Sequence, residues 1–142
     1  MMGATSGRFE VLSHTADKGI QAFGSSMEEL FENAARGMFS LMADLDKYSP
    51  VETRTFELES PDPASLLRTW LAELLYEFEV DRVLFVDFDV EIEGDRLRGM
   101  ARGLPFDPSI EWLGSSVKAV TYHGLYVRQT GQRWEAQVIF DV

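Results

Sequence analysis

The chain has 142 residues, no cysteine, and a formal net charge of −11 at pH 7. A chain of this length suits one domain with a buried core, and the missing cysteines exclude disulfides, thiolate zinc sites and a cysteine nucleophile. Because affinity for nucleic acid comes largely from lysine and arginine contacts to phosphates, the charge argues against direct nucleic-acid binding. An acidic surface can steer the chain toward a basic protein partner, although solubility alone explains the charge equally well.

Residues 1–7 are small and polar and lack the apolar core of a signal peptide. We interpret them as a flexible N-terminal tail that precedes a single domain of residues 8–142. No apolar stretch approaches the ~20 residues needed to cross a bilayer, so no membrane association is expected. The absence of cysteine fits a cytoplasmic protein.

The first predicted elements are two short strands. Residues 9–12 and 19–23 have the composition of strands, and the segment between them contains His14 and Asp17. The pattern therefore places Asp17 in a loop.

Two amphipathic helices are predicted next. The first begins at Ser26, which forms a capping-box pattern with Glu29, and should end near Ala43. The second has Asp62 as its cap and Pro63 at its first helical position. Apolar residues recur at helical spacing, namely Leu30, Phe31, Ala34, Met38, Phe39 and Met42, then Leu66, Leu67, Trp70, Leu71, Leu74, Leu75 and Phe78. Because each helix is apolar on one face, each should lie on a sheet.

The clearest hairpin follows the second helix. Residues 84–92 alternate apolar and acidic side chains up to a two-residue turn at Gly94-Asp95. The register predicts three facing charge pairs, which are Glu93 with Arg96, Glu91 with Arg98 and Asp87 with Arg102. One face of this hairpin should therefore be apolar and the other charged.

The other strands complete the predicted fold. Residues 52–59 alternate as a half-buried strand, and residues 104–116 form a loop with two prolines. Residues 117–128 and 134–140 should pair as a second hairpin. Strands interrupted by two helices predict an α+β fold, in which two amphipathic helices pack on a largely antiparallel sheet in two layers.

Few residues signal catalysis. His14 and Asp17 could form a functional pair, or Asp17 could cap a turn while His14 binds the backbone. His123 could be a general base or a ligand, or could simply be hydrogen-bonded within a strand. No serine or cysteine lies in a recognisable nucleophile elbow, and no Gly-rich phosphate loop is present.

Two groups of acids could bind a cation. The run Asp87, Asp89, Glu91 and Glu93 resembles a metal cluster, but its alternation opposite arginines favours a solvated, charge-paired face. At the C-terminus, Asp141 should point away from the core-facing Phe140, beside the terminal carboxylate of Val142. Two fixed anions so close would be relieved by a hard divalent cation, although a simply solvated end is the alternative.

Several blocks of the sequence resemble the archease family. They are His14-Thr15-Ala16-Asp17, Gly24-Ser25-Ser26, residues 28–35, Gly37-Met38-Phe39, residues 117–123 and residues 138–142. The similarity runs from about Phe9 to Val142, and the blocks occur in order.

This resemblance implies a function that periodicity does not show. Archeases assist the GTP-dependent RNA ligase that joins tRNA halves, by promoting guanylylation of the ligase's active-site histidine and so allowing multiple turnover. They are not known as enzymes themselves. The resemblance implies a divalent metal, Ca²⁺ or alternatively Mg²⁺ or Mn²⁺, bound by Asp17, Asp141 and Val142. The implied partner is the catalytic subunit of the tRNA-splicing ligase.

Two positions depart from the family pattern. Lys18 follows Asp17 where many relatives have an aliphatic residue, which places a cation beside the implied metal site. Glu111 stands where many relatives have histidine. Two other functions stay open, which are a stand-alone metal-dependent hydrolase and a chaperone-like interaction module whose metal is structural.

Overall fold

The structure, a computed structural model, describes residues 8–13 and 17–142. The predicted tail of residues 1–7, together with His14, Thr15 and Ala16, lies outside the described residues. In chain order the elements are β1 (Phe9–Ser13), β2 (Asp17–Gly24), α1 (Met27–Ser40), the 3-10 helix η1 (Leu45–Lys47), β3 (Glu52–Glu59), α2 (Pro63–Asp81), β4 (Val83–Glu93), β5 (Arg96–Pro105), β6 (Ala119–Val120), β7 (Tyr126–Thr130) and β8 (Arg133–Asp141).

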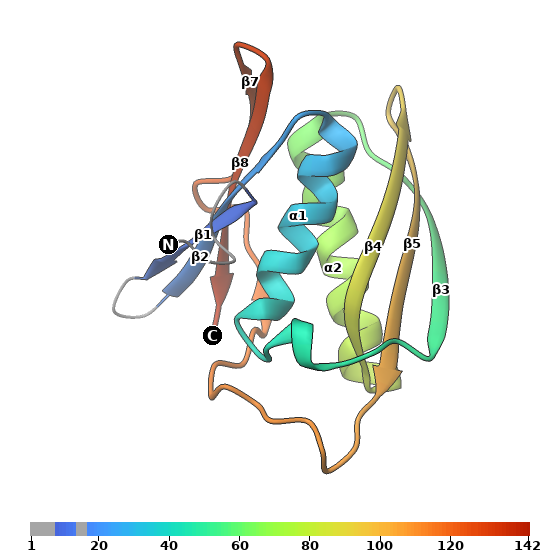
Figure 1. The fold of residues 1–142 in the computed structure, drawn as a ribbon. Helices are drawn as coiled ribbons and strands as arrows, with labels where there is room; N and C mark the ends of the chain where they lie inside the picture. Colours follow the sequence, from blue (N-terminus) through green and yellow to red (C-terminus); the bar gives the residue numbers. More distant parts are fainter. Residues whose placement is uncertain (1–7, 14–16) are drawn as a thin grey trace.

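The described strands form two antiparallel sheets with the helices between them (Figure 1). The five-stranded sheet has the order β1-β2-β8-β6, with β7 also paired to β8, and the three-stranded sheet has the order β3-β5-β4. Helix α1 contacts both β2 and β4, and α2 contacts strands of both sheets as well. The predicted α+β class is confirmed. The elements form three layers and not two, because the strands divide between two sheets.

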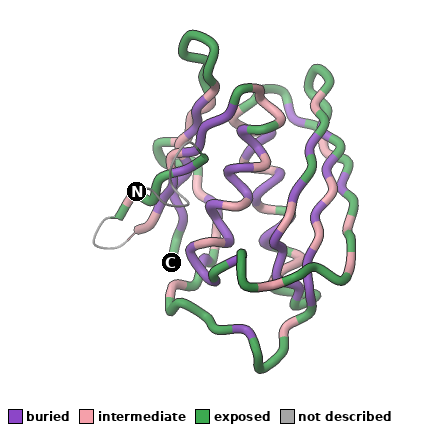
Figure 2. Tube along the Cα trace, in the orientation of Figure 1, coloured by how far each residue is buried: buried purple, intermediate pink, exposed green. Residues whose placement is uncertain are grey.

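The flanking sheets bury most of the surface of α1 (Figure 2). Its buried residues are Leu30, Phe31, Asn33, Ala34, Ala35, Gly37, Met38 and Phe39. Only a narrow polar stripe that includes Glu29, Glu32 and Arg36 reaches solvent. A helix with one sheet beside it would need a single apolar face, whereas α1 needs two.

Capping side chains begin both helices where the sequence predicts. Ser26 Oγ accepts a hydrogen bond from the Glu29 N–H at 3.1 Å, and the Glu29 carboxylate accepts one from the Ser25 N–H at 2.7 Å. Asp62 Oδ1 accepts from the Ser65 N–H at 2.8 Å. These bonds satisfy amide groups that have no partner within the first turn of a helix.

Helix α1 ends at Ser40, before the predicted Ala43. Met42 and Ala43 remain buried, which explains why the apolar pattern continues past the end of the helix. The chain leaves the helix because Ala43 pairs as an isolated bridge with Trp112 of the β5–β6 connection.

The β4–β5 hairpin has the predicted register. Glu93 lies opposite Arg96, Glu91 opposite Arg98 and Asp87 opposite Arg102. The ladder shifts between Phe85 and Asp87, so a bulge at Val86 lengthens β4 by one residue relative to β5.

The predicted strand of residues 117–128 is wrong in its middle part. β6 and β7 both pair with β8, but the five residues 121–125 between them span only two positions of β8, Val138 and Ile139, so the chain leaves the ladder there. Gly124 has a φ of 63°, which glycine adopts without steric cost. Thr121 Oγ1 donates to the Ile139 carbonyl at 2.8 Å and accepts from the His123 N–H at 3.2 Å. These bonds stabilise the excursion against the strand propensity of its residues.

Candidate functional site

Asp17 is the first residue of β2 and does not lie in a loop. The reason is its pairing with β8, whose register sets Asp17 directly opposite Asp141. The strand therefore begins two residues before the segment whose composition suggested it. The structure thus brings together two of the three residues implied as metal ligands.

Asp17 and Asp141 project from the same face of the five-stranded sheet. Phe140 is fully buried on the helix side and Asp141 is exposed, so strand alternation directs Asp141 outward. Directly opposite residues in an antiparallel pair have Cβ atoms about 4.5–5.5 Å apart, and like charges at this spacing repel. Within residues 8–13 and 17–142, neither carboxylate forms an ion pair with an arginine or a lysine. Two oxygen ligands with unbalanced charge fit a hard divalent cation.

The final residues of β8 are held on both sides. β2 lies along one edge and β6 along the other, where Ala119 pairs with Asp141. The Lys118 N–H donates to the main-chain oxygen of Asp141 at 2.8 Å. Val142 follows directly and is 39% exposed. Its main-chain oxygens therefore lie one residue from the paired carboxylates.

The ammonium group of Lys18 is directed away from the two carboxylates. Lys18 neighbours Asp17 in β2, so its side chain leaves the opposite face of the strand. Its Nζ donates to Ser115 Oγ at 2.6 Å. This departure from the family pattern therefore places no cation between Asp17 and Asp141.

No three histidine, cysteine, aspartate or glutamate side chains are grouped to hold a metal ion in the described part of the chain. A site built on Asp17 and Asp141 therefore needs main-chain oxygens or water to complete its coordination. Ca²⁺ and Mg²⁺ both accept such ligands. The donor set fits an oxygen-liganded divalent ion and does not fit a structural zinc site, which requires nitrogen or sulfur ligands.

The other candidate residues lie apart from this pair or outside the description. His14 is not described. His123 is exposed in the excursion that follows β6, and its main-chain N–H binds Thr121. Glu111 is exposed and pairs with Lys47 at 3.4 Å, while its N–H donates to the Tyr48 hydroxyl.

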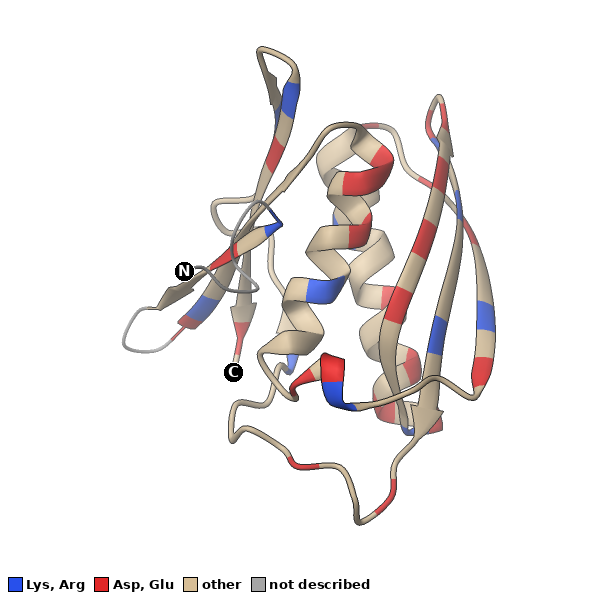
Figure 3. Cartoon of the chain, in the orientation of Figure 1, with Lys and Arg blue, Asp and Glu red and all other residues tan. Residues whose placement is uncertain are grey.

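The acidic run of β4 forms the charge-paired face that the alternation favoured (Figure 3). Arg102 contacts Asp87 at 3.0 Å and Asp89 at 2.7 Å. Arg98 approaches Glu91 at 3.9 Å. Arginines of the adjacent strand thus pair with Asp87, Asp89 and Glu91, whereas Arg96, opposite Glu93, contacts Glu59 at 3.5 Å. The described residues of this face form no metal cluster.

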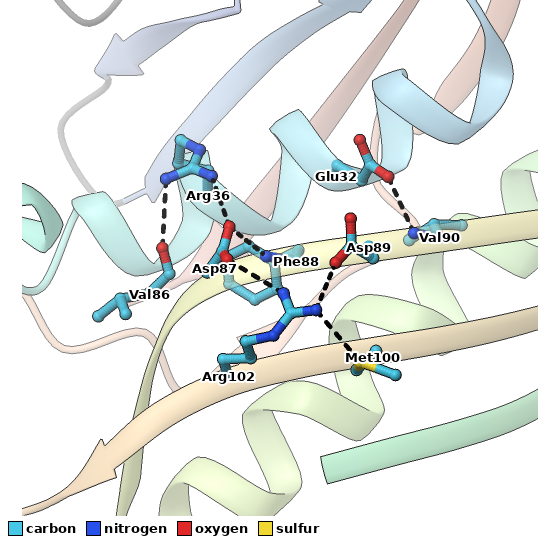
Figure 4. Close-up of polar contacts among 9 residues, drawn as sticks. All are labelled: Glu32, Arg36, Val86, Asp87, Phe88, Asp89, Val90, Met100 and Arg102. Atoms are coloured by element: carbon cyan, nitrogen blue, oxygen red, sulfur yellow. Dashed lines mark hydrogen bonds and ion pairs between the residues drawn. The ribbon is translucent and has the colours of Figure 1, made fainter. Parts of the chain in front are cut away.

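Sequence reasoning missed a set of contacts between α1 and β4 (Figure 4). Glu32 accepts a hydrogen bond from the Val90 N–H at 2.9 Å, and Arg36 donates to the Val86 carbonyl at 3.2 Å. β4 is an edge strand, so these side chains satisfy main-chain groups that have no neighbouring strand. The pKa of Glu32 is raised, chiefly because burial disfavours the charged carboxylate. The negative charge of Asp89 raises this pKa further, whereas the hydrogen bond from the Val90 N–H lowers it. The polar stripe of α1 is the only sequence signal of these contacts.

Neither described helix combines the length and the hydropathy that a membrane-spanning segment needs. The fold and the carboxylate pair together define a small α+β protein in which β2 and β8, the second and the last of the described strands, meet at an acidic, metal-compatible end.

Comparison with known proteins identifies the family. Residues 9–142 match the Archease protein family (MTH1598/TM1083). Protein archease of Methanosarcina mazei is 43% identical over 140 residues, which cover 95% of this chain and 96% of that protein. Protein archease of Methanopyrus kandleri is 38% identical and covers 94% of this chain and 99% of that protein. The chain belongs to the archease family.

Solved structures show the same fold. The solution structure of protein 1598 from Methanobacterium thermoautotrophicum has a TM-score of 0.85 and 38% identity, and the match covers 94% of this chain and 98% of that one. The crystal structure of an archease from Thermotoga maritima, titled a possible chaperone, has a TM-score of 0.62 and 23% identity, with 94% and 96% covered. The second likeness concerns the fold alone.

Proposed function

We propose that this protein is an accessory factor that activates a GTP-dependent tRNA-splicing RNA ligase, without being an enzyme itself. Membership of the archease family supports the class of activity. The observation that carries the proposal for the site is the direct pairing of Asp17 with Asp141 on the outer face of the sheet.

The site would hold a divalent ion through the carboxylates of Asp17 and Asp141 and the terminal carboxylate of Val142. The strand ladder fixes the main chain of Asp17 and Asp141 directly opposite each other, so the fold itself brings the two residues together. We propose that this end docks beside the nucleotide site of the ligase while the ligase histidine is guanylylated. A bound cation would supply positive charge near the nucleotide phosphates, since phosphoryl-type transfer depends mainly on positioning and charge neutralisation.

A ligation assay tests the function. The purified ligase should turn over more than once on broken tRNA only when this protein is added, and Asp17→Ala and Asp141→Ala should lose the stimulation. Lys18→Ala is the matched control, because Lys18 lies in the same strand but its side chain leaves the opposite face. Its stimulation should stay close to that of the unaltered protein.

The same assay separates the rival functions. Hydrolysis of GTP or RNA by this protein alone, lost in Asp17→Ala, would favour a stand-alone metal-dependent hydrolase. Suppressed aggregation of unrelated proteins, with no effect on the ligase, would favour a chaperone-like module. Either result would contradict the proposal.

A further inference from the structure

The connection between β5 and β6 presents two large apolar side chains to solvent. Trp112 is 44% exposed and Leu113 is 59% exposed. We call residues 111–114 the Trp–Leu loop. Its main chain is held firmly, because Trp112 pairs with Ala43 and the Leu113 N–H donates to the Met42 carbonyl at 2.8 Å.

The indole ring of Trp112 is fixed from beneath by other aromatic rings. Its centroid lies 4.9 Å from that of Phe106 and 5.8 Å from that of Phe78, and both contacts are edge-to-face. These contacts orient the ring while nearly half of the residue stays exposed. A preoriented aromatic side chain loses little conformational entropy when a partner covers it, which is the property of an interface anchor.

A hydrogen bond ties the chain just after the Trp–Leu loop to the start of β2. Ser115, which accepts the hydrogen bond from Lys18, is two residues beyond Leu113. Two residues of extended chain span at most about 7 Å, so Leu113 and the start of β2 share one end of the molecule. The Lys18 side chain leaves the face of β2 opposite to Asp17, so a partner must cover this end of the molecule to contact both the apolar pair and Asp17.

The charge around the Trp–Leu loop indicates the chemistry of that partner. Glu111, Asp107, Asp44 and Asp46 are exposed close to it in the chain or across the Ala43–Trp112 bridge. The nearby cations are Lys47, which pairs with Glu111, Arg82, which stands over the Phe106 ring, and Lys18, so the acids outnumber the cations. A second copy of this chain would set one acidic rim against another, and each copy carries a net charge of −11. The complementary surface is an apolar pocket with a basic rim.

We propose that the Trp–Leu loop is the docking anchor through which the ligase catalytic subunit binds this protein. The inference rests on the proposed function, and it adds the contact surface. The apolar pair enters a pocket of the ligase, basic residues of the ligase face the acidic rim, and the Asp17 end is thereby brought to the nucleotide site.

Binding measurements on the full chain and the purified ligase test the anchor. Leu113→Asp places a charge at an exposed position, so the variant should fold, and it should weaken binding to the ligase by about tenfold or more. Val80→Asp is the matched control, because Val80 is 58% exposed on α2 and receives the same change. It should leave the dissociation constant within about twofold.

Two further measurements keep the result interpretable. Trp112→Ala should also weaken binding, and its melting temperature will show whether the loss of contacts with Phe78 and Phe106 destabilises the fold. The rise in melting temperature on addition of divalent ion should persist in Leu113→Asp, because that variant leaves the carboxylate pair intact.

Each other outcome overturns a stated part of the argument. If the unaltered protein stimulates the ligase and Leu113→Asp binds equally well, the anchor is wrong and the proposed function stands. If the unaltered protein neither binds nor stimulates the ligase, the proposed function fails and the anchor fails with it. If the unaltered protein is a dimer that Leu113→Asp dissociates, a second copy covers the loop and the anchor is wrong.

Discussion

The acidic residues of this protein differ in role according to what faces them. Asp17 and Asp141 face each other, whereas Asp87 and Asp89 face Arg102. Repulsion within the first pair makes cation binding favourable, and the arginine removes that tendency from the second. The identity of the cross-strand neighbour therefore decides which carboxylates face another anion and which face an arginine.

The first prediction concerns thermal stability with and without metal. Asp17→Ala and Asp141→Ala should change the metal-free free energy of unfolding by less than about 1 kcal/mol, or raise it, because each relieves a like-charge contact. The unaltered protein should melt at a higher temperature with millimolar Ca²⁺, Mg²⁺ or Mn²⁺, since a ligand that binds only the native state stabilises it. Thermal melts should show no such rise in the two variants.

A residue added after Val142 gives a second check on the same site. The extension converts the terminal carboxylate into a neutral peptide group, so the metal-induced rise in melting temperature should shrink. An undiminished rise in the extended protein would remove Val142 from the proposed ligand set.

A second prediction concerns Glu32. Burial raises its pKa, so the native state binds the proton more tightly than the unfolded chain does. The stability linked to this proton is present below the ordinary pKa of about 4.3 and is lost as pH rises through the raised value. Glu32→Gln still accepts the hydrogen bond from Val90 and carries no buried charge. At pH 7 it should be as stable as the unaltered protein or more stable by up to about 1 kcal/mol.

Glu135 is the matched control, because its shift has the opposite sign. Hydrogen bonds from Thr130 and Arg128 lower the pKa of Glu135. The contribution of its carboxylate to folding stability is therefore present above the ordinary pKa and is lost as pH falls through the lowered value. Glu135→Gln should destabilise the protein at pH 7 by about 1–2 kcal/mol, and less in acid. Urea unfolding at pH 7 and pH 4 measures both variants, and a loss of stability in Glu32→Gln at pH 7 would contradict the prediction.

At the scale of elements, local sequence signals determined where most helices and strands begin. Ser26 and Asp62 cap the helices as predicted, and the alternation of residues 84–92 fixed the β4–β5 register. Capping and alternation are local properties, so they can be read without knowing the fold. The residue at which α1 ends is not set by the neighbouring sequence, because it depends on the pairing of Ala43 with the distant Trp112.

The caps lead to a third prediction. Ser26→Ala removes the hydrogen bond that the hydroxyl accepts from Glu29, and should lower the free energy of unfolding by about 1 kcal/mol. Asp62→Ala should cost a similar amount at the start of α2. Urea denaturation measures both, and Ser49→Ala, an exposed position outside the helices and strands, serves as the control.

At the scale of the whole molecule, periodicity identified the apolar faces and left their partners undetermined. It gave the α+β class, but the division of strands between two sheets depends on which distant strands pair, such as β2 with β8. The candidate site was likewise predictable in its residues but not in their arrangement. The resemblance named Asp17, Asp141 and Val142, whereas only the register shows the first two face to face. The excursion of residues 121–125 could not be predicted, since threonine and tyrosine favour strands.

The net charge leads to a fourth prediction, which concerns salt. Exposed charges are screened within about 8 Å at physiological ionic strength, so binding to a basic partner should weaken as salt rises. Binding to the ligase should therefore be tighter at 50 mM than at 300 mM NaCl, measured by titration calorimetry.

Free tRNA should show no binding in the low micromolar range at physiological salt, because this chain lacks the excess of cations that phosphate contacts need. A gel shift at that concentration would contradict the prediction.

The pairing of β2 with β8 also has a consequence for the order of folding. The three-stranded sheet and α2 draw on a continuous stretch of chain, residues 52–105, and can form early from nearby contacts. The ladder between Asp17 and Asp141 joins residues nearly the whole chain apart, and closing so long a loop is slow. The carboxylate pair therefore comes into existence only when β2 pairs with β8. An ion that binds there selects completely folded molecules, so the rate at which binding appears during refolding should equal the rate of the slowest folding phase.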